Sequence, residues 1–313
     1  MSQKFVVASD SSFSLARAVA VGFEAELLVL ETGKFADTEW YVQFENVARL
    51  KGASVFVVGQ FEHVSGLPIS DQFMQVLFLA HQSKLHGADR VVVLFPYLPY
   101  ARQCRDVKSK FVGLLGTVGV LCNSVGIDSI VACEVHETSC CAILQVPLRN
   151  VGCETVWQEV LGRELGPRVE GVCFVSPDEG GVERVKRLAQ RARAQWAFVK
   201  KRRVAHDQSV AIELQGADVK NKTVVFVDDI IDTGITAVQA SEKVLEHGAK
   251  RVFGCFVHPV LTPGAIARLE TSVFERVWVC DTIRLDEVDL GKKITVVSIN
   301  NLVVEYVRTV VRF

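Results

Sequence analysis

Short apolar runs, each bounded by turn residues, recur along the chain and constrain its fold more than any other feature. They are KFVVAS (4–9), ELLVLE (26–31), SVFVVG (54–59), RVVVLFP (90–96), SIVACE (129–134), GVCFVSP (171–177), WAFVKK (196–201), TVVFVDD (223–229), KRVFGCFV (250–257) and RVWVC (276–280). Continuous apolar runs are typical of strands covered on both faces. Segments with helical spacing lie between them, so the sequence predicts βαβ units and mostly parallel sheets.

Two intervening segments carry clear helical signals. The segment ISDQFMQVLFLAHQSKLHG (69–87) predicts a helix with one apolar face, made of Phe73, Val76, Leu77, Ala80 and Leu85. The segment ITAVQASEKVLEHGAK (235–250) predicts a helix that ends at Gly248, where a glycine C-cap is expected. A last helix is expected at about 299–311.

The length of 313 residues suggests two domains, since a domain averages roughly 150 residues. Each half contains a long apolar strand that ends in a polar loop and opens a helix, RVVVLFPYLPYARQCR in the first and TVVFVDDIIDTGIT in the second. We expect domains at 1–152 and 153–313, and the last helix can pack back on the first. Two α/β domains of this kind would face a shared cleft with their loops.

Charge and cysteine content exclude several classes of protein. Lys and Arg number 35 against 36 Asp and Glu, which argues against an obligate nucleic-acid binder. No stretch approaches the roughly 18 apolar residues of a membrane span, and the N-terminus lacks a signal peptide, so we expect a cytoplasmic protein. The nine cysteines form no C-x-x-C pair and suit buried free thiols, although the adjacent Cys140 and Cys141 could instead form a strained disulfide.

The sharpest chemical signal is VVFVDDIIDTGIT (224–236), a strand followed by carboxylates and a helix start. A helix N-terminus presents free N–H groups and a positive dipole end, which suit a phosphate. The carboxylates of Asp228 and Asp229 suit ribose hydroxyls or a Mg²⁺ ion instead. Asp232 or Thr233 could merely cap the helix, but the whole arrangement describes a ribose 5-phosphate site.

This segment resembles the phosphoribosyl-binding signature shared by phosphoribosyltransferases and ribose-phosphate pyrophosphokinases. Four other segments resemble the pyrophosphokinases alone: FPYLPYARQCR (95–105), the block from FVSPDEGG to KKRR (174–203), CFVHPVLTPGAIARL (255–269) and KFADTEWYVQF (34–44). The resemblance runs from about residue 5 to 300. It implies two similar phosphoribosyltransferase-type domains, each a mostly parallel sheet flanked by helices.

The resemblance also implies a reaction and its partners. In this family the β,γ-pyrophosphoryl group of ATP passes to the C1 hydroxyl of ribose 5-phosphate, with Mg²⁺ as cofactor, and gives 5-phosphoribosyl 1-pyrophosphate and AMP. ATP would bind mainly to the first domain and ribose 5-phosphate to the second. Homo-oligomers are usual in the family, so a hexamer is expected.

Site residues follow from the matched motifs. The resemblance assigns catalysis to Lys201, Arg203 and Lys108, ATP binding to Phe35, Asp37, Glu39, Arg102 and Gln103, ribose 5-phosphate binding to Asp228, Asp229, Asp232, Thr233, Gly234 and Thr236, and the metal to His136 and Asp178. An extended backbone would put Lys201 and Arg203 on one side, where both can hold the transferring phosphate. A solvated basic run is the plain alternative for KKRR, and a structural role is the alternative for His136.

Several positions depart from the family pattern. Cys104 replaces an Asp that follows YARQ in the family. Thr38 replaces the Gly of the family's FSDGE stretch, which recognises adenine. In the family, this adenine loop comes from a neighbouring subunit. The phosphate loop reads T-G-I-T, so Ile235 stands where a small residue is usual and the glycine turn must come one residue earlier, at Gly234. The catalytic loop (106–120) has lost its Pro and continues into an apolar segment. The C-terminus lacks the family's tail, so no allosteric site is inferred.

Two other functions stay open on the sequence. A catalytically weak regulatory paralogue would account for the altered loop and Cys104. A phosphoribosyltransferase would account for residues 224–236 but not for the segments YARQ, SPDEGG and KKRR.

Overall fold

A computed structural model describes residues 3–8, 13–44, 47–62, 66–103, 113–137, 142–166, 171–203, 210–286 and 288–310. The chain divides into two compact units. Unit 1 comprises residues 1–152, 282–287 and 299–313, and unit 2 comprises residues 153–281 and 288–298. The return of the chain to unit 1 at 282–287 was not expected from the sequence.

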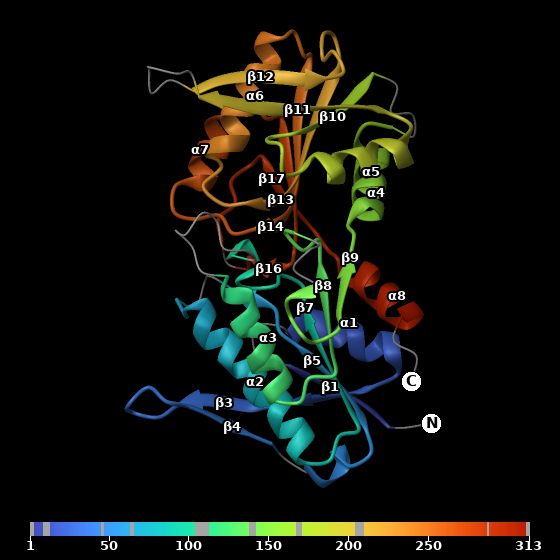
Figure 1. The fold of residues 1–313 in the computed structure, drawn as a ribbon, viewed down its shortest axis with the longest axis vertical. Helices are drawn as coiled ribbons and strands as arrows, with labels where there is room; N and C mark the ends of the chain where they lie inside the picture. Colours follow the sequence, from blue (N-terminus) through green and yellow to red (C-terminus); the bar gives the residue numbers. More distant parts are fainter. Residues whose placement is uncertain are drawn as a thin grey trace. The chain divides into compact units, whose positions relative to one another are not determined.

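Unit 1 is built on a parallel six-stranded sheet, in the order β2-β1-β5-β7-β8-β9. Its strands are β1 (Lys4–Ala8), β2 (Glu26–Val29), β5 (Ser54–Val58), β7 (Arg90–Phe95), β8 (Ser129–Cys133) and β9 (Leu148–Val151). Its helices are α1 (Phe13–Phe23), α2 (Ile69–Leu85), α3 (Leu114–Ser124) and α8 (Asn300–Val310), with α1 and α8 side by side (Figure 1). A hairpin of β3 (Glu31–Lys34) and β4 (Trp40–Gln43) projects beyond the sheet (Figure 1), and β6 (Phe61–Glu62) pairs with β16 (Ile283–Arg284).

Unit 2 has a seven-stranded sheet, in the order β12-β11-β10-β13-β14-β15-β17, with only β12 antiparallel to its neighbour. Its strands are β10 (Val172–Ser176), β11 (Gln195–Arg203), β12 (Val210–Gly216), β13 (Thr223–Ile231), β14 (Arg251–Pro259), β15 (Arg276–Cys280) and β17 (Ile294–Val297). Helices α4 (Glu154–Glu164) and α5 (Val182–Ala192) lie on one side of the strands, and α6 (Ile235–Glu246) and α7 (Ala265–Thr271) lie on the other (Figure 1).

The two sheets share one strand order. If β12 is set aside and the six strands of each sheet are numbered 1 to 6 along the chain, both sheets have the strand order 2-1-3-4-5-6. In both units the extra antiparallel element, the β3–β4 hairpin or strand β12, follows the second strand of the sheet. The similar rhythm of the two halves in sequence therefore corresponds to a repeated topology.

The central strands form the core, because every residue of β5, β8 and β10 is buried. The predicted face of α2 is buried at Phe73, Val76, Leu77 and Ala80, but the prediction is wrong for Leu85, which is 65% exposed. Leu85 is the last residue of the helix, where the chain turns away through Gly87 at a φ of +84°. Helix α6 ends at Glu246 with His247 as its C-cap, so the predicted glycine cap is off by one residue: Gly248 follows the cap, at a φ of +87°.

The described cysteines are buried free thiols, as predicted: Cys122, Cys133, Cys153, Cys173, Cys255 and Cys280. Burial raises the pKa of the Cys173 thiol to about 11 and that of Cys122 to about 12, so both stay protonated at neutral pH. Cys104, Cys140 and Cys141 lie outside the described residues. No helix in the described part of the chain is long and apolar enough to cross a membrane.

A partly buried ion pair joins α4 to α5 and makes the stability of unit 2 depend on pH. Glu154 is 8% exposed and accepts a hydrogen bond of 2.6 Å from Arg187 Nε. Burial acts to raise the pKa of Glu154, but the hydrogen bonds from Arg187 and from the backbone, with the charges of Arg187 and Arg191, outweigh it and lower the pKa. A lowered carboxyl pKa stabilises the fold above the unfolded-state value of about 4.3 and loses that contribution as the pH falls through the folded-state value.

We therefore expect Glu154→Gln to destabilise unit 2 by about 1 kcal/mol at pH 7, since half of the Arg187 side chain is in solvent. The difference from wild type should shrink as the pH falls from 7 through the lowered folded-state pKa of Glu154, because the carboxyl group is then neutral like the amide of Gln. Thermal unfolding across this pH range measures both. Glu164→Gln is the control: it breaks a more exposed pair of the same helix, with Arg276 at 2.9 Å, and should change stability by less than about 0.5 kcal/mol. An equal effect of the two substitutions would contradict the prediction.

Candidate active site

The strand order of unit 2 creates a switch point between β10 and β13. These strands are parallel neighbours, but the chain leaves β10 toward β11 on one side and returns through β13 on the other. In open α/β sheets, ligands bind beyond the carboxyl ends of the strands at such a point. The segments SPDEGG and DDIIDTGIT both begin there, one at the end of β10 and one at the end of β13.

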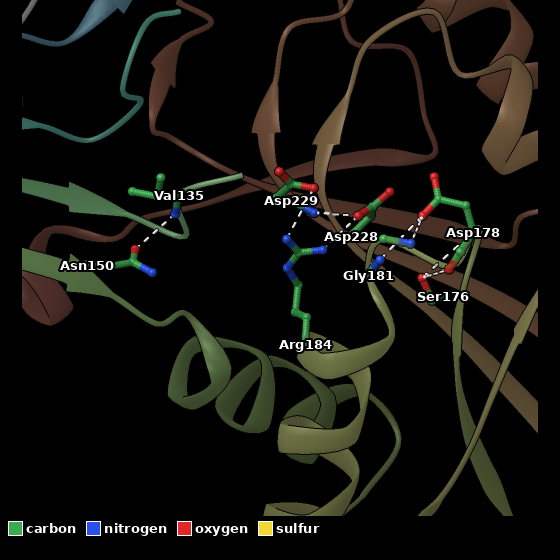
Figure 2. A network of polar contacts seen from close by, with 9 residues as sticks. Val135, Asn150, Ser176, Asp178, Gly181, Arg184, Asp228 and Asp229 are labelled. Carbon is green, nitrogen blue, oxygen red and sulfur yellow. Dashed lines mark hydrogen bonds and ion pairs between the residues drawn. The ribbon is translucent and has the colours of Figure 1, made fainter. Parts of the chain in front are cut away.

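The turn after β10 is held by Asp178 and shaped by two glycines. Asp178 Oδ1 accepts the backbone N–H groups of Gly180 at 2.8 Å and Gly181 at 3.3 Å. Ser176 Oγ donates to the carbonyl oxygen of Asp178 at 2.7 Å. A Cβ atom on Gly181 would lie 2.5 Å from Ser176 Oγ and 3.3 Å from Asp228 Oδ1, so this position has no room for a side chain. Figure 2 shows Asp178, Asp228 and Asp229 in one cluster.

The adjacent carboxylates at the end of β13 share one guanidinium. Arg184 Nη1 donates to Asp228 Oδ1 at 2.8 Å, and Arg184 Nη2 lies 3.3 Å from Asp229 Oδ1 (Figure 2). Burial and the charge of Asp229 raise the pKa of Asp228 well above its ordinary value, with a further contribution from Asp178, while Arg184 opposes the rise. The cluster is therefore rich in oxygen acceptors and only partly neutralised by the protein.

The next loop has the geometry of an anion site. Gly234 has a φ of +74°, and α6 begins at Ile235, so the glycine turn is placed one residue earlier than in the usual pattern. Ile235 is 43% exposed and lies in the helix rather than in the turn. Thr233 is exposed and Thr236 half-buried, and Asp232 is half-buried beside them. Arg268 of α7 donates to the carbonyl oxygen of Thr233, which places a guanidinium beside the loop.

The predicted metal residues belong to different units. Asp178 lies in the acidic cluster of unit 2, whereas His136 follows β8 in unit 1 and is exposed. Among the described residues, no group of three His, Cys, Asp or Glu side chains could hold a metal ion by itself. Mg²⁺ usually takes one or two carboxylates and fills its remaining positions with water and substrate phosphates. The oxygen-rich cluster, in which Asp228 and Asp229 share one guanidinium and Asp178 lies beside them, fits such a partial site.

The predicted catalytic residues are only partly described. Strand β11 extends through Arg203, so Lys201 and Arg203 stand on the extended backbone that their predicted role requires, opposite Ile212 and Val210 of β12. The structure does not describe their side chains, and Lys108 and Cys104 lie outside the described residues.

The predicted ATP residues lie in unit 1. Arg102 is exposed in a 3₁₀ turn, Ala101–Gln103, and the side chain of Gln103 is not described. Phe35, Asp37 and Glu39 are exposed at the tip of the β3–β4 hairpin. This tip is closed by hydrogen bonds from Phe35 N to Glu39 O and from Thr38 N to Phe35 O, both 2.9 Å long.

Comparison with known proteins identifies the family. A model described as the N-terminal domain of ribose phosphate pyrophosphokinase matches residues 5–113, and a phosphoribosyl transferase domain matches residues 167–279. The ribose-phosphate pyrophosphokinase of Buchnera aphidicola is 33% identical over 301 residues, which cover 95% of this chain and 92% of its own. The chain belongs to the ribose-phosphate pyrophosphokinase family.

Other members of the pyrophosphokinase family support the assignment. The chloroplastic ribose-phosphate pyrophosphokinase 2 of Spinacia oleracea is 32% identical, over 93% of this chain and 72% of its own. The crystal structure of phosphoribosylpyrophosphate synthetase from Mycobacterium smegmatis superposes with a TM-score of 0.89 at 26% identity, over 99% of both chains. The predicted family and the predicted α/β fold with two phosphoribosyltransferase-type domains are therefore confirmed.

Two arginines near the site were missed by sequence reasoning. Arg184 and Arg268 lie in the pyrophosphokinase-like blocks, but their partners, Asp228 and Thr233, are 44 and 35 residues away. One local signal for a role of Arg184 was its position directly before Val185, which puts a charged residue on the apolar side of the helix that follows SPDEGG.

Thr38 occupies the strained position that the pyrophosphokinase pattern gives to glycine. Its φ is +75°, a conformation that costs a non-glycine residue about 1–2 kcal/mol and is least suited to a β-branched side chain. We expect Thr38→Gly to stabilise the hairpin tip by about 1 kcal/mol, and so to slow hydrogen exchange of the Phe35 N–H about fivefold. Thr38→Ala keeps the strain and should bring no such gain. Equal exchange rates in the two variants would contradict this account of the turn.

Proposed function

We propose that this chain transfers the β,γ-pyrophosphoryl group of ATP to the C1 hydroxyl of ribose 5-phosphate and releases AMP and 5-phosphoribosyl 1-pyrophosphate. Family membership over nearly the whole chain supports this function. The observation that carries it is the arrangement at the switch point of unit 2, where paired carboxylates near the end of β13 precede a glycine turn and a helix N-terminus. Acceptors for a sugar diol and donors for a phosphate are thereby joined in one loop.

In this proposal the loop from β13 to α6 binds ribose 5-phosphate. The backbone N–H groups at the start of α6, with the hydroxyls of Thr233 and Thr236, would hold the 5-phosphate. Gly234 supplies the turn that lets the backbone approach the anion. Asp228 and Asp229 would accept hydrogen bonds from the ribose hydroxyls, and Asp232 would complete the pocket.

The other proposed roles fall to unit 1 and to strand β11. Phe35 would stack on adenine, with Asp37 and Glu39 accepting hydrogen bonds from its amino group and Arg102 and Gln103 contacting ATP. Positive charge around the transferring phosphorus would come from Lys201, Arg203 and Lys108. Such a transfer depends mainly on the alignment of the reacting groups and on positive charge.

We propose His136 and Asp178 as the residues that hold Mg²⁺. A bound Mg²⁺ supplies positive charge that neutralises the phosphate oxygens of ATP. Asp178 suits this task because it is a hard oxygen ligand in a turn already fixed by Gly180 and Gly181. His136 is an unusual Mg²⁺ ligand and would act partly through water.

One assay tests the proposal against its two alternatives. Purified protein is incubated with ATP, Mg²⁺ and ribose 5-phosphate, and AMP is measured. AMP that forms only with ribose 5-phosphate supports the proposed function. Binding of ribose 5-phosphate without AMP would instead indicate a regulatory paralogue, and consumption of phosphoribosyl pyrophosphate with a nucleobase would indicate a transferase. Family membership favours the first outcome.

We also propose an assembly and a location for the protein. We expect a homo-oligomer, with six subunits as the family resemblance implies, because the adenine loop of one subunit would serve the site of its neighbour. Sedimentation of active enzyme tests this, and a fully active monomer would contradict it. The buried free thiols suit the cytoplasm, which we propose as the location.

A further inference from the structure

Arg184 is a buried charge that faces the predicted ribose site. It follows the SPDEGG turn in the first turn of α5, and it is only 8% exposed. Its guanidinium reaches both adjacent carboxylates of β13, at 2.8 Å for Asp228 and 3.3 Å for Asp229 (Figure 2). One side chain of α5 thus fixes two residues at the end of a strand that lies 44 residues further along the chain.

The carboxylates need this partner because they are themselves withdrawn from water. Asp229 is 3% exposed, and its backbone N–H donates to Asp228 Oδ1 at 2.9 Å, which fixes the Asp228 carboxylate against the backbone of β13. Buried carboxylates are costly unless a positive charge and hydrogen bonds compensate them. Burial and Asp229 raise the pKa of Asp228 and Arg184 opposes the rise, so the arginine favours the ionised pair.

The geometry leaves acceptor atoms for a ligand. Both donors that reach Asp228 from described residues, Arg184 Nη1 and Asp229 N, bind the same oxygen, Oδ1. In Figure 2 the second carboxylate oxygens of Asp178 and Asp228 point away from Arg184. Arg184 therefore holds Asp228 through Oδ1, while the second oxygen of that carboxylate points away from the guanidinium.

The neighbouring glycine maintains this arrangement. A Cβ atom on Gly181 would lie 3.2 Å from Arg184 Nη1 and 3.3 Å from Asp228 Oδ1, within the space through which the two side chains meet. The SPDEGG turn therefore makes room for the arginine as well as for a phosphate.

We propose that Arg184 is a positioning residue of the ribose 5-phosphate site, which holds Asp228 and Asp229 in the orientation in which they accept hydrogen bonds from the ribose hydroxyls. The inference rests on the proposed function, since it assumes that the pair binds ribose. Arg184 touches neither substrate nor reacting atoms in this account and acts only through the two carboxylates.

A purely structural role makes a different prediction. An ion pair that only joins α5 to β13 would affect both substrates alike when it is lost, through the stability of unit 2. A positioning residue would affect ribose 5-phosphate selectively. The comparison of the two substrates therefore separates the roles.

The experiment compares Arg184→Met, Arg184→Lys and Arg187→Met with wild type. Arg187 is a matched control, because it lies on the same helix and its ion pair with Glu154, at 2.6 Å, lies outside the acidic cluster. Titration calorimetry measures ribose 5-phosphate binding, and steady-state kinetics give KM for ribose 5-phosphate and for ATP. Circular dichroism reports whether each variant is folded.

We expect Arg184→Met to weaken ribose 5-phosphate binding and raise its KM about 10- to 100-fold, with KM for ATP changed by less than about threefold. Arg184→Lys should fall between wild type and the Met variant, since an ammonium group keeps the charge but cannot bind both carboxylates with a planar fork. Arg187→Met should leave both KM values within about threefold of wild type.

The proposal is overturned if Arg184→Met weakens ribose 5-phosphate no more than Arg187→Met does, or if it raises both KM values equally. If the Met variant does not fold, Arg184→Lys decides, and an unchanged affinity in that variant overturns the proposal. A wild-type protein that binds ribose 5-phosphate without forming AMP would refute the proposed function alone, because the calorimetric comparison would still test Arg184.

Discussion

Substitution of Lys201 by Ala should lower kcat about 100- to 1,000-fold, or about 2.7–4 kcal/mol in activation free energy. Transfer of a pyrophosphoryl group needs little covalent help from the protein, so fixed positive charge near the moving phosphorus supplies most of the catalysis. Lys201 lies on β11, which pairs with β12 as far as Arg203. The backbone at Lys201 is therefore held in a defined place. The measurement is steady-state formation of AMP from ATP and ribose 5-phosphate at saturating substrate.

Lys200→Ala is the matched control for this prediction. Lys200 is the preceding residue of the same strand, and its ammonium lies 3.0 Å from the exposed carboxylate of Glu179. The loss of such a surface pair should change kcat by less than about threefold. Turnover of the Lys201 variant near the wild-type rate would remove Lys201 from the mechanism, and KKRR would then be the solvated basic run that the sequence left open.

Substitution of Gly119 by Ala should be the most damaging single methyl addition in unit 1. Gly119 is buried on α3, and a Cβ atom there would lie 2.1 Å from the carbonyl oxygen of Leu144 and 2.5 Å from its carbonyl carbon. These are backbone atoms of the buried residue Leu144 and cannot rotate away as a side chain can. We expect a loss of about 3 kcal/mol or more, which corresponds to a fall of roughly 6–12 °C in the unfolding temperature.

Gly116→Ala tests the same chemistry one turn earlier on α3. A Cβ atom at Gly116 would meet only Ile143 Cγ2, at an ordinary contact distance of 3.6 Å. Alanine is the better helix former, so this variant should be as stable as wild type or more stable by up to about 1 kcal/mol. Equal unfolding temperatures for the two variants would show that α3 and residue 144 do not approach as described.

The Gly119 contact also explains one departure from the family pattern. Residues 114–120 of the altered catalytic loop (106–120) belong to helix α3, and Gly119 lets this helix press against the turn at Leu144. The sequence pattern predicts only a changed loop at 106–120, which is wrong for residues 114–120 because they are helical. The apolar residues of α3 contribute to the core of unit 1, because Leu115, Val118 and Cys122 are buried.

The sequence alone was sufficient to predict the central strands, the two domains and the loop at residues 228–236. The reason is local. A strand covered on both faces must be a continuous apolar run, and a glycine followed by a helix start has its own backbone signature, so neighbouring residues carry the information. The shift of the glycine turn to Gly234 could be read from the order T-G-I-T for the same reason.

The tertiary structure alone decided the edge strands, the crossing at 282–287 and the partner of Arg184. Strands β3 and β9 have the sequences ETGK and LRNV and are not buried along their length, so they lack the apolar runs that mark a buried strand. Arg184 meets Asp228 and Asp229 only because β10 and β13 are neighbours in the sheet, which brings together residues 44 apart in the chain. Pairing between distant segments depends on the topology of the whole sheet, and no local pattern of residues specifies it.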